Sequence, residues 1–386
     1  MAMSTADNTT TTAKKITTAE PNVSPIVHGV ESTPVPVKLS RPRPVAPIRR
    51  FDLARRDLAE LLESEPAYRV KQVWAGLYEQ GLDIEEMTSL PKALRARLSA
   101  EDSMGTSLLK EVESSSEAGE TIKWLWGLHD ASRIETVLMH YKERSTVCIS
   151  SQAGCAMGCG FCATGQAGFK RQLTTGEIVE QVIRARRRAA DDGRRLSNVV
   201  FMGMGEPMAN YDAVWNTVEH LHADLGMSAR HITISTVGII PGIRRLTDEA
   251  LPVNLAVSLH AADDEKRNAL VPINRTYPLA ALADACAAYF DATHRRVSFE
   301  WALIDGVNDS FADARQLAAY ARPLHAHINL IPLNPTPGYP TVGTRPAGVR
   351  AFCDALIELG VNATIRRNRG TGIDAACGQL SARQLE

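Results

Sequence analysis

Apolar segments alternate with amphipathic segments from residue 146 to residue 360 of this 386-residue chain. The apolar segments predict strands at 146–151, 197–203, 231–236, 253–260, 296–304 and 326–332. The amphipathic segments predict helices at about 174–191, 210–225, 239–250, 277–293, 309–322 and 346–360. Strands and helices that alternate at these lengths favour βαβ units, and therefore an α/β fold with a parallel sheet. Six such units are too few for a closed eight-stranded barrel.

Three further regions precede this alternation. Residues 1–48 are rich in Thr, Ser and Pro without apolar periodicity, so we expect a disordered N-terminal tail. Residues 49–120 predict a small helical accessory domain with one apolar helical face that is typical of a buried core. That face consists of Val70, Val73, Trp74 and Leu77. Residues 121–141 predict strands that lead into a main domain over 121–386.

Composition limits the function classes. A formal net charge of -1 excludes a generally basic surface, so any nucleic-acid site must be a local patch. We find no apolar run long enough to span a bilayer and no secretory leader. Four of the seven cysteines lie between residues 148 and 162, which is not typical of a secreted disulfide framework, so we expect a cytoplasmic protein. Cys286 and Cys353 lie in predicted helices, and we interpret them as buried apolar residues.

Three cysteines form the most chemically specific pattern in the chain. Cys155, Cys159 and Cys162 have the spacing C-x3-C-x2-C in a glycine-rich loop that follows the first predicted strand. A four-iron cluster usually binds four protein thiolates, so three leave one iron open for another ligand. An incomplete ligand set of this kind is typical of a metal centre that performs chemistry. The alternative is a structural zinc site that Cys148 or a distant histidine completes.

The loop around these cysteines resembles that of the radical S-adenosylmethionine (SAM) superfamily, including the aromatic Phe161 before the last cysteine. Within the superfamily, the chain resembles the RlmN/Cfr family of RNA adenine methyltransferases over roughly residues 51–385. The resemblance implies a partial (β/α)6 barrel, a 4Fe–4S cluster on the three cysteines, SAM on the open iron, and a role of the helical domain in RNA recognition. In this superfamily, an electron from the cluster cleaves SAM to a 5'-deoxyadenosyl radical, while the protein positions and shields the cofactor.

Polar and glycine residues follow several predicted strands, at the end where a barrel of this type builds its site. Gly205 and Glu206 begin a Gly-Glu-Pro turn after the second strand. A carboxylate there can accept a hydrogen bond from an ammonium group, and the missing glycine side chain admits a ligand. The resemblance implies that this turn contacts the SAM amino group. The further SAM contacts that it implies are Ser235, Ser258, Leu259, His260 and Asn334.

A cysteine far from the cluster loop narrows the family. Cys377 lies in a segment, from Ile373 to Leu380, that matches the family nearly residue for residue. The resemblance implies that Cys377 carries the methyl group, that Cys148 is the second catalytic cysteine, and that Glu135 is the proton acceptor.

The implied reaction has two stages, because the C2 carbon of adenine cannot attack the SAM methyl group directly. The Cys377 thiolate first takes a methyl group from one SAM molecule. A radical from a second SAM removes hydrogen from the S-methyl group, and the resulting methylene radical adds to C2, which joins protein and RNA in a thioether. A base removes the C2 proton, and the Cys148 thiolate attacks the Cys377 sulfur to release the product. Reduction of the resulting Cys148–Cys377 disulfide resets the enzyme.

The family acts on an adenosine of 23S rRNA near the peptidyl-transferase centre and on the adenosine just 3' of the anticodon in some tRNAs. The resemblance therefore implies both RNAs as partners. We also expect an electron donor that is flavodoxin-like or similar, no membrane and a monomeric enzyme. A reactive adenine must be unstacked or lie in a loop. The candidates for phosphate contacts are Arg366, Arg367, Arg369, Lys170 and Arg171. A run of arginines on the first predicted helix is more typical of a solvated face: Arg184, Arg186, Arg187 and Arg188.

Two other functions stay open at this point. A Cfr-like enzyme methylates C8 of adenine with the same cysteines, so these residues do not separate the two positions. The helical domain and the segment around Cys377 favour the C2-methylating RlmN branch by likeness. A zinc-containing RNA-binding module would instead use the cysteines as a structural site.

Overall fold

In the part of the chain that the structure describes, a ten-stranded sheet forms the main domain, and seven neighbouring strands of it are parallel. In order across the sheet these are β4 (Ser145–Cys148), β7 (Leu196–Phe201), β8 (Ile232–Thr236), β9 (Asn254–Ser258), β10 (Ser298–Leu303), β11 (His327–Pro332) and β12 (Asn362–Ile365). The first six confirm the predicted strands. β12 was not predicted, because only one of its four residues is buried and it carries little apolar signal.

The computed structural model describes residues 46–116, 118–336, 338–340, 342–366 and 368–381. Almost all of the tail expected over residues 1–48 therefore lies outside the described residues. Within the described ranges, none of the helices combines the length and the apolar character needed to cross a membrane.

Three antiparallel strands extend the sheet beyond β4. They are β1 (Leu109–Ser115), β2 (Thr121–Gly127) and β3 (Arg133–His140). β2 and β3 confirm the strands expected over 121–141. β1 carries no buried side chain, so nothing in its sequence distinguished it from the helical domain that we expected to reach residue 120. Since β1 pairs with β2, we now propose a domain boundary between Met104 and Leu109.

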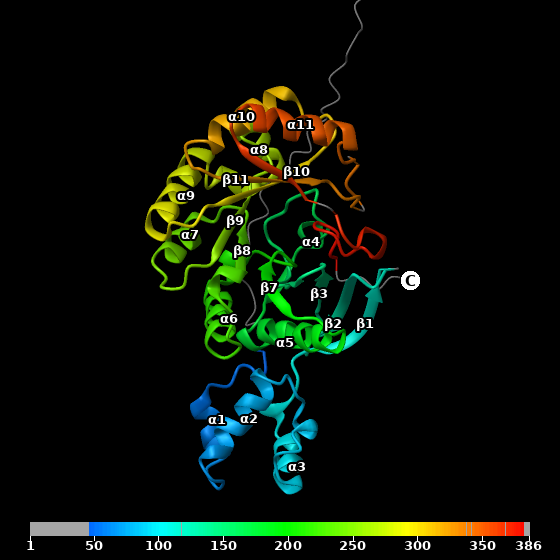
Figure 1. The fold of residues 1–386 in the computed structure, drawn as a ribbon, viewed down its shortest axis with the longest axis vertical. Coiled ribbons are helices and arrows are strands. Elements are labelled where there is room, and N and C mark those ends of the chain that lie inside the picture. Colours follow the sequence, from blue (N-terminus) through cyan, green and yellow to red (C-terminus); the bar gives the residue numbers. More distant parts are fainter. Residues whose placement is uncertain (1–45, 117, 337, 341, 367, 382–386) are drawn as a thin grey trace, which may run out of the picture. The chain divides into compact units, whose positions relative to one another are not determined.

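Helices follow the parallel strands and flank the sheet (Figure 1). The six predicted helices are confirmed as α5 (Thr175–Asp191), α6 (Tyr211–Ala223), α7 (Ile240–Thr247), α9 (Leu279–Thr293), α10 (Phe311–Ala321) and α11 (Pro346–Glu358). Helix α5 begins at a capping box, in which Thr174 and Glu177 each accept a hydrogen bond from the other's backbone N–H. Cys286 of α9 and Cys353 of α11 are buried, as expected.

Short elements surround the loop of three cysteines. The strands β5 (Gln152–Gly154) and β6 (Phe169–Gln172) form a hairpin, and helix α4 (Ala163–Gln166) begins directly after Cys162. Helix α8 (Asp264–Leu270) follows β9. None of these was expected, because each is too short to show a period. Because the carboxyl ends of parallel strands meet at one edge, the loops after them gather there.

The helical domain contains α1 (Arg55–Leu61), α2 (Tyr68–Tyr78) and α3 (Lys92–Ala100). On α2, Val73, Trp74 and Leu77 are buried and Val70 packs against them, which confirms the predicted core face. The Trp74 ring also stacks on Tyr78 at a centroid distance of 4.5 Å. This face is therefore structural.

The arginines of α5 do not form a solvated face, so that expectation is wrong. Three contact the helical domain: Arg184 pairs with Asp83, Arg186 donates to the Tyr78 carbonyl, and Arg187 pairs with Glu86. Arg188 pairs with Glu113 of β1 and with Asp192. These side chains join the helical domain and the sheet edge to α5.

Glu180 is the buried anion of the same contact. Its side chain is fully buried and accepts hydrogen bonds from the Ser107 N–H (2.8 Å) and from Arg184 (3.0 Å). Arg50 of the helical domain lies 3.3 Å from it. The Thr106 hydroxyl also donates to it, so Glu180 is the acceptor on which four donors converge.

We expect Glu180→Ala to lower the free energy of unfolding by about 3 kcal/mol or more, because buried donors and a buried cation lose their partner. Urea unfolding of the cluster-free protein measures this change. The control Arg187→Ala removes a more exposed pair of the same helix and should cost about 1 kcal/mol or less. Equal costs for the two variants would contradict the role of Glu180 as the buried anchor.

Candidate active site

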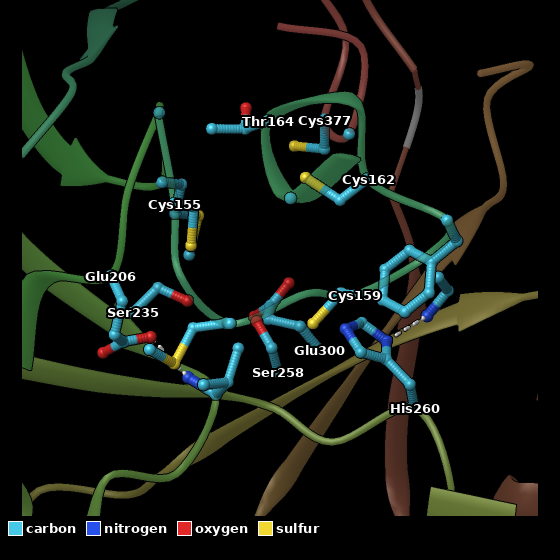
Figure 2. A pocket seen from close by; sticks show the side chains of 18 of the residues that line it. Cys155, Cys159, Cys162, Thr164, Glu206, Ser235, Ser258, His260, Glu300 and Cys377 are labelled. Atoms are coloured by element: carbon cyan, nitrogen blue, oxygen red, sulfur yellow. Dashed lines mark hydrogen bonds between the residues drawn. The ribbon is translucent and has the colours of Figure 1, made fainter. Parts of the chain in front are cut away.

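One pocket lies at the carboxyl ends of the parallel strands and gathers most of the candidate residues. Ten of them line it: Cys155, Cys159, Cys162, Gly205, Glu206, Ser235, Ser258, His260, Asn334 and Cys377. They come from the cysteine loop after β5, from the ends of β7, β8, β9 and β11, and from the C-terminal segment. Figure 2 shows the three cysteines of the loop and Cys377 around one hollow.

The three loop cysteines share a water-poor environment. Cys159 is buried, and Cys155 and Cys162 are half-buried. Burial raises the pKa of the Cys155 thiol to about 12 and that of Cys159 well above its usual range. The neighbouring thiols and Glu206 raise both further, because like charges disfavour one another. Such thiols become thiolates readily only beside a group that supplies positive charge.

These residues fit a 4Fe–4S cluster better than a zinc ion. Among the described residues, no three or more His, Cys, Asp and Glu side chains are arranged to hold a single metal ion. A cluster binds each thiolate through a different iron and therefore accepts a wider spacing. Cys148, which the zinc alternative would recruit, lines a separate pocket.

The Gly-Glu-Pro turn after β7 brings a buried carboxylate to the pocket. Gly205 has a φ of +101°, and a Cβ atom there would lie 2.5 Å from the Gln152 side chain. Glycine is therefore required here because Gln152 of β5 packs against it, and not because it makes room for a ligand as we expected. Glu206 accepts hydrogen bonds from the N–H groups of Met208 (3.0 Å) and Val237 (2.9 Å). Burial nonetheless raises the pKa of Glu206 to about 7.

The next candidate residues lie on β8 and after β9. Ser235 and Ser258 line the pocket, whereas Leu259 is fully buried in the core and does not. His260 follows in a left-handed conformation (φ +59°), and its Nδ1 accepts a hydrogen bond from the Ala302 N–H (3.0 Å). Burial lowers the pKa of His260 to about 3, so its ring is neutral and the proton is on Nε2.

A buried arginine that the sequence did not indicate joins these strand ends. The guanidinium of Arg267, on α8, donates to the carbonyl groups of Val237 (2.7 Å), Ser258 (3.3 Å) and Leu259 (3.0 Å) and to the Asn274 side chain (2.6 Å). The described residues supply no carboxylate that pairs with it, and burial lowers its pKa. Because its acceptors follow both β8 and β9, Arg267 fixes the two loops relative to each other.

The segment that carries Cys377 is docked on the cysteine loop and lies beside α4 (Figure 1). The Ala163 N–H donates to the Gly378 carbonyl (2.8 Å), and the Thr164 hydroxyl donates to the Leu380 carbonyl (2.6 Å). Both bonds use backbone carbonyl groups of the segment, so they leave the Cys377 sulfur outside the contact.

Asn334 and Lys123 hold the same segment from other sides. The Asn334 amide donates to the Cys377 carbonyl (3.0 Å), and Lys123 of β2 donates to the Asp374 carbonyl (3.2 Å). Asn334 also lines the pocket, so this side chain links the pocket wall to the Cys377 segment.

A second, smaller pocket lies beside the first and contains Cys148. Three residues line both pockets and form a partition between them: Met202, Arg366 and Cys377. Cys148 is buried, and burial raises its pKa to about 12. All seven cysteines are free thiols, so the expected Cys148–Cys377 disulfide is not formed in this structure.

Glu135 lines neither pocket. Its buried carboxylate pairs with Lys123 (3.0 Å) and accepts a hydrogen bond from the Ser381 N–H (2.8 Å). Alternation along β3 puts it on the same face as Val137 and Met139, which line the second pocket. Glu135 therefore lies two residues before Val137, the nearest residue of β3 that lines the Cys148 pocket, and it contacts the end of the C-terminal segment at Ser381.

The basic residues expected to contact phosphate have different environments. Arg366 lies inside, where it lines both pockets. Arg171 is buried in ion pairs and is not available to phosphate, so that expectation is wrong. Arg369 pairs with a carboxylate at the edge of the second pocket, Lys170 is exposed, and Arg367 lies outside the described residues.

Glu300 of β10 is a pocket residue that our sequence reading missed. It is buried and accepts a hydrogen bond from Asn329 (2.8 Å). Burial raises its pKa, which the charge of Arg366 opposes. The available signal was an acidic residue between Phe299 and Trp301, two core residues of an otherwise apolar strand.

Comparisons with known proteins agree with this geometry. Residues 149–318 match the family model of the radical SAM superfamily. The chain is 48% identical over 363 residues to a probable dual-specificity RNA methyltransferase RlmN of Frankia alni, with 90% of this chain and 86% of that protein covered. It is also 48% identical to the dual-specificity RNA methyltransferase RlmN 1 of Myxococcus xanthus, with 86% and 94% covered.

Among solved structures, a radical SAM methyltransferase from Sphaerobacter thermophilus matches with a TM-score of 0.84 at 48% identity. The match covers 87% of this chain and 100% of that one. With a partial barrel, three cysteines at the carboxyl ends of its strands and these relatives, the chain belongs to the RlmN family of radical SAM RNA methyltransferases.

Proposed function

We propose that this protein methylates the C2 carbon of adenine in 23S rRNA and tRNA, with Cys377 as the carrier of the methyl group. One observation carries the proposal: Cys377 lines both the pocket of the three loop cysteines and the pocket that contains Cys148. A methyl carrier must receive its group at one place and meet the releasing thiol at another. The RNA substrates are proposed from the names of the curated relatives.

The first pocket is proposed to hold the cofactors. Cys155, Cys159 and Cys162 would bind a 4Fe–4S cluster, which when bound supplies the electron that cleaves SAM to a radical. Glu206, beside Gly205, would accept a hydrogen bond from the SAM amino group, since it is a buried carboxylate that lines this pocket. Ser235, Ser258, His260 and Asn334 would surround the rest of SAM.

Cys377 is proposed to act first as a nucleophile toward the SAM methyl group. The hydrogen bonds that dock its segment use the carbonyl groups of Cys377 and Gly378, so they position the residue without engaging its sulfur. The same sulfur would later carry the methylene group to adenine.

Glu135 and Cys148 are proposed to act after the carbon has been transferred. The ion pair with Lys123 holds the Glu135 carboxylate in place, and Glu135 would take the C2 proton. Because Glu135 lines neither pocket, the end of the C-terminal segment, whose Ser381 N–H donates to Glu135, would have to shift before the C2 proton could reach it. Cys148 would then attack the Cys377 sulfur and form a transient disulfide.

We further propose that the helical domain contributes to RNA recognition, and that the enzyme works as a cytoplasmic monomer with a flavodoxin-like electron donor. The contacts of α5 with Asp83 and Glu86 support a fixed attachment of that domain to the catalytic one. An adenine would have to leave its stack to reach either pocket.

The first test uses the reconstituted protein with methyl-labelled SAM and unmodified RNA. We expect label at adenine C2, located by mass mapping, and no label with Cys377→Ala. Cys353→Ala, a buried cysteine of α11 outside both pockets, is the matched control and should retain labelling. Label at C8 would replace the proposal by a Cfr-like activity.

The second test follows the release step. Cys148→Ala removes the attacking thiolate, so we expect a covalent protein–RNA adduct that gel electrophoresis under denaturing conditions retains. Formation of free methylated RNA by this variant at the wild-type rate would refute the proposed role of Cys148.

The third test concerns Glu206. The pKa of Glu206 is about 7 in the folded protein, above the usual value of 4.5. Its contribution to the free energy of unfolding is therefore fully present below pH 4.5 and is lost as the pH rises through 7. Glu206→Gln does not titrate, and its stability relative to wild type should therefore rise by about 2 to 3 kcal/mol between pH 5 and pH 8. Unfolding of the SAM-free protein at both pH values measures this difference.

The same Glu206→Gln variant should bind SAM about tenfold more weakly or worse, because a charged acceptor is lost. Equilibrium dialysis with the cluster-loaded protein measures that affinity. Unchanged SAM binding would exclude Glu206 as the partner of the amino group, whatever its effect on stability.

A further inference from the structure

Arg366 is the charged member of the partition between the two pockets. It follows β12, and its backbone N–H donates to the Leu330 carbonyl (2.8 Å), which fixes the start of its side chain. Its guanidinium contacts the Met202 sulfur (3.7 Å), a weak acceptor. In the described ranges, no carboxylate forms an ion pair with Arg366. A half-buried cation with such a weak partner is suited to stabilise a charge that forms during the reaction.

The negative groups around Arg366 are those of the two pockets. Cys377 raises the pKa of Arg366 most, and Glu300, Cys148 and Tyr141 raise it further. The attraction between two ionised groups is mutual, so a cation that is favoured by a thiolate also favours that thiolate.

Cys148 needs such a partner. Its thiol is buried beside a second thiol, and both conditions oppose the anion that a nucleophile requires. Two groups lower the pKa of Cys148 and so favour its thiolate: the charge of Arg366 and a hydrogen bond from the Met202 backbone. Met202 therefore links both groups, since its backbone faces Cys148 and its sulfur contacts Arg366.

Among the described residues, the other titratable groups that face Cys148 supply no second free cation. Tyr141 at the end of β3 and Cys377 are neutral or negative, and Glu300 lies on the far side of the partition. Arg369 lines the Cys148 pocket, but it pairs with Glu120 (2.9 Å) and stacks on the Tyr141 ring at 4.4 Å.

We propose that Arg366 is a positioning residue whose guanidinium stabilises the Cys148 thiolate, so that this buried sulfur can attack Cys377 in the release step. The proposal rests on the proposed role of Cys148. In that step a bond forms between the two sulfur atoms, and the bond from the Cys377 sulfur to the transferred carbon breaks. Its electron pair goes to the carbon, which takes a proton from water to become the methyl group.

The test measures the reactivity of Cys148 without SAM or RNA. Cluster-loaded protein in a Cys377→Ala background is treated anaerobically with methyl methanethiosulfonate. A thiolate takes the methylthio group from this reagent and releases methanesulfinate, and mass spectrometry of the Cys148 peptide gives the rate. The background variant prevents Cys377 from resolving the mixed disulfide.

At pH 9 we expect Arg366→Met to slow the modification of Cys148 about tenfold, which corresponds to a pKa higher by about one unit. Arg366→Lys keeps the charge and should stay within about threefold of the parent protein. Arg369→Met removes a paired arginine of the same pocket and should leave the rate unchanged. An unchanged rate in Arg366→Met, equal slowing in the Lys variant, or equal slowing in Arg369→Met would each overturn the proposal.

Glu300→Gln provides an effect of opposite sign. It removes the carboxylate that competes for Arg366, so we expect faster modification of Cys148, which an altered access path or poor folding of Arg366→Met would not produce. A rate that stays constant or falls would contradict the proposal. If Cys148→Ala released free methylated RNA while these rate changes were present, the release role would fail and the electrostatic role of Arg366 would stand.

Discussion

The docking of the C-terminal segment onto the cysteine loop is the interaction on which the site depends. Two hydrogen bonds from Ala163 and Thr164 bring Cys377 to a pocket that is otherwise built from the middle of the chain. Asn334, which follows β11, and Lys123 of β2 hold the segment from two other sides. Each bond contributes only about 1 kcal/mol net, but together they come from three different parts of the fold and define one position. Because every acceptor is a backbone carbonyl, that position follows from the path of the chain, and the reactive sulfur is not consumed in holding it.

The two pockets concentrate ionisable groups that lack ordinary partners. Glu206 and Glu300 are buried without a salt bridge among the described residues, and burial raises the pKa of both. Arg267, whose acceptors Val237 and Ser258 line the first pocket, donates to three carbonyl groups and an amide oxygen in place of a carboxylate. By contrast, the buried charges of α5 are paired and join the helical domain to the sheet. Unpaired burial is costly and is typical of sites where a ligand or a reaction step supplies the missing charge.

The parts of the fold that were predicted from the sequence are those with a local signal. β9 and β10 lie between other strands, so their residues form apolar runs, whereas β1 and β12 are largely exposed and left no such pattern. The cysteine loop and the turn at Gly205 were recognised from short motifs. The contacts of Arg171, Arg187 and Arg366 were not recognised. An arginine in the sequence carries no sign of whether its guanidinium faces solvent, a distant carboxylate or a pocket. Likewise, Gln152 fills the space beside Gly205, and no local sequence pattern predicts a contact between residues so far apart in the chain.

The partition of Met202, Arg366 and Cys377 has a consequence for the order of events in a catalytic cycle. Cys377 lines both pockets, so its single sulfur atom lies where the two meet. Under the proposed function, a cofactor in the first pocket and an RNA base in the second would each meet the Cys377 sulfur without occupying the same space. The proposed reaction uses two SAM molecules for every base, so separate pockets would let the second SAM bind while the base stays in place.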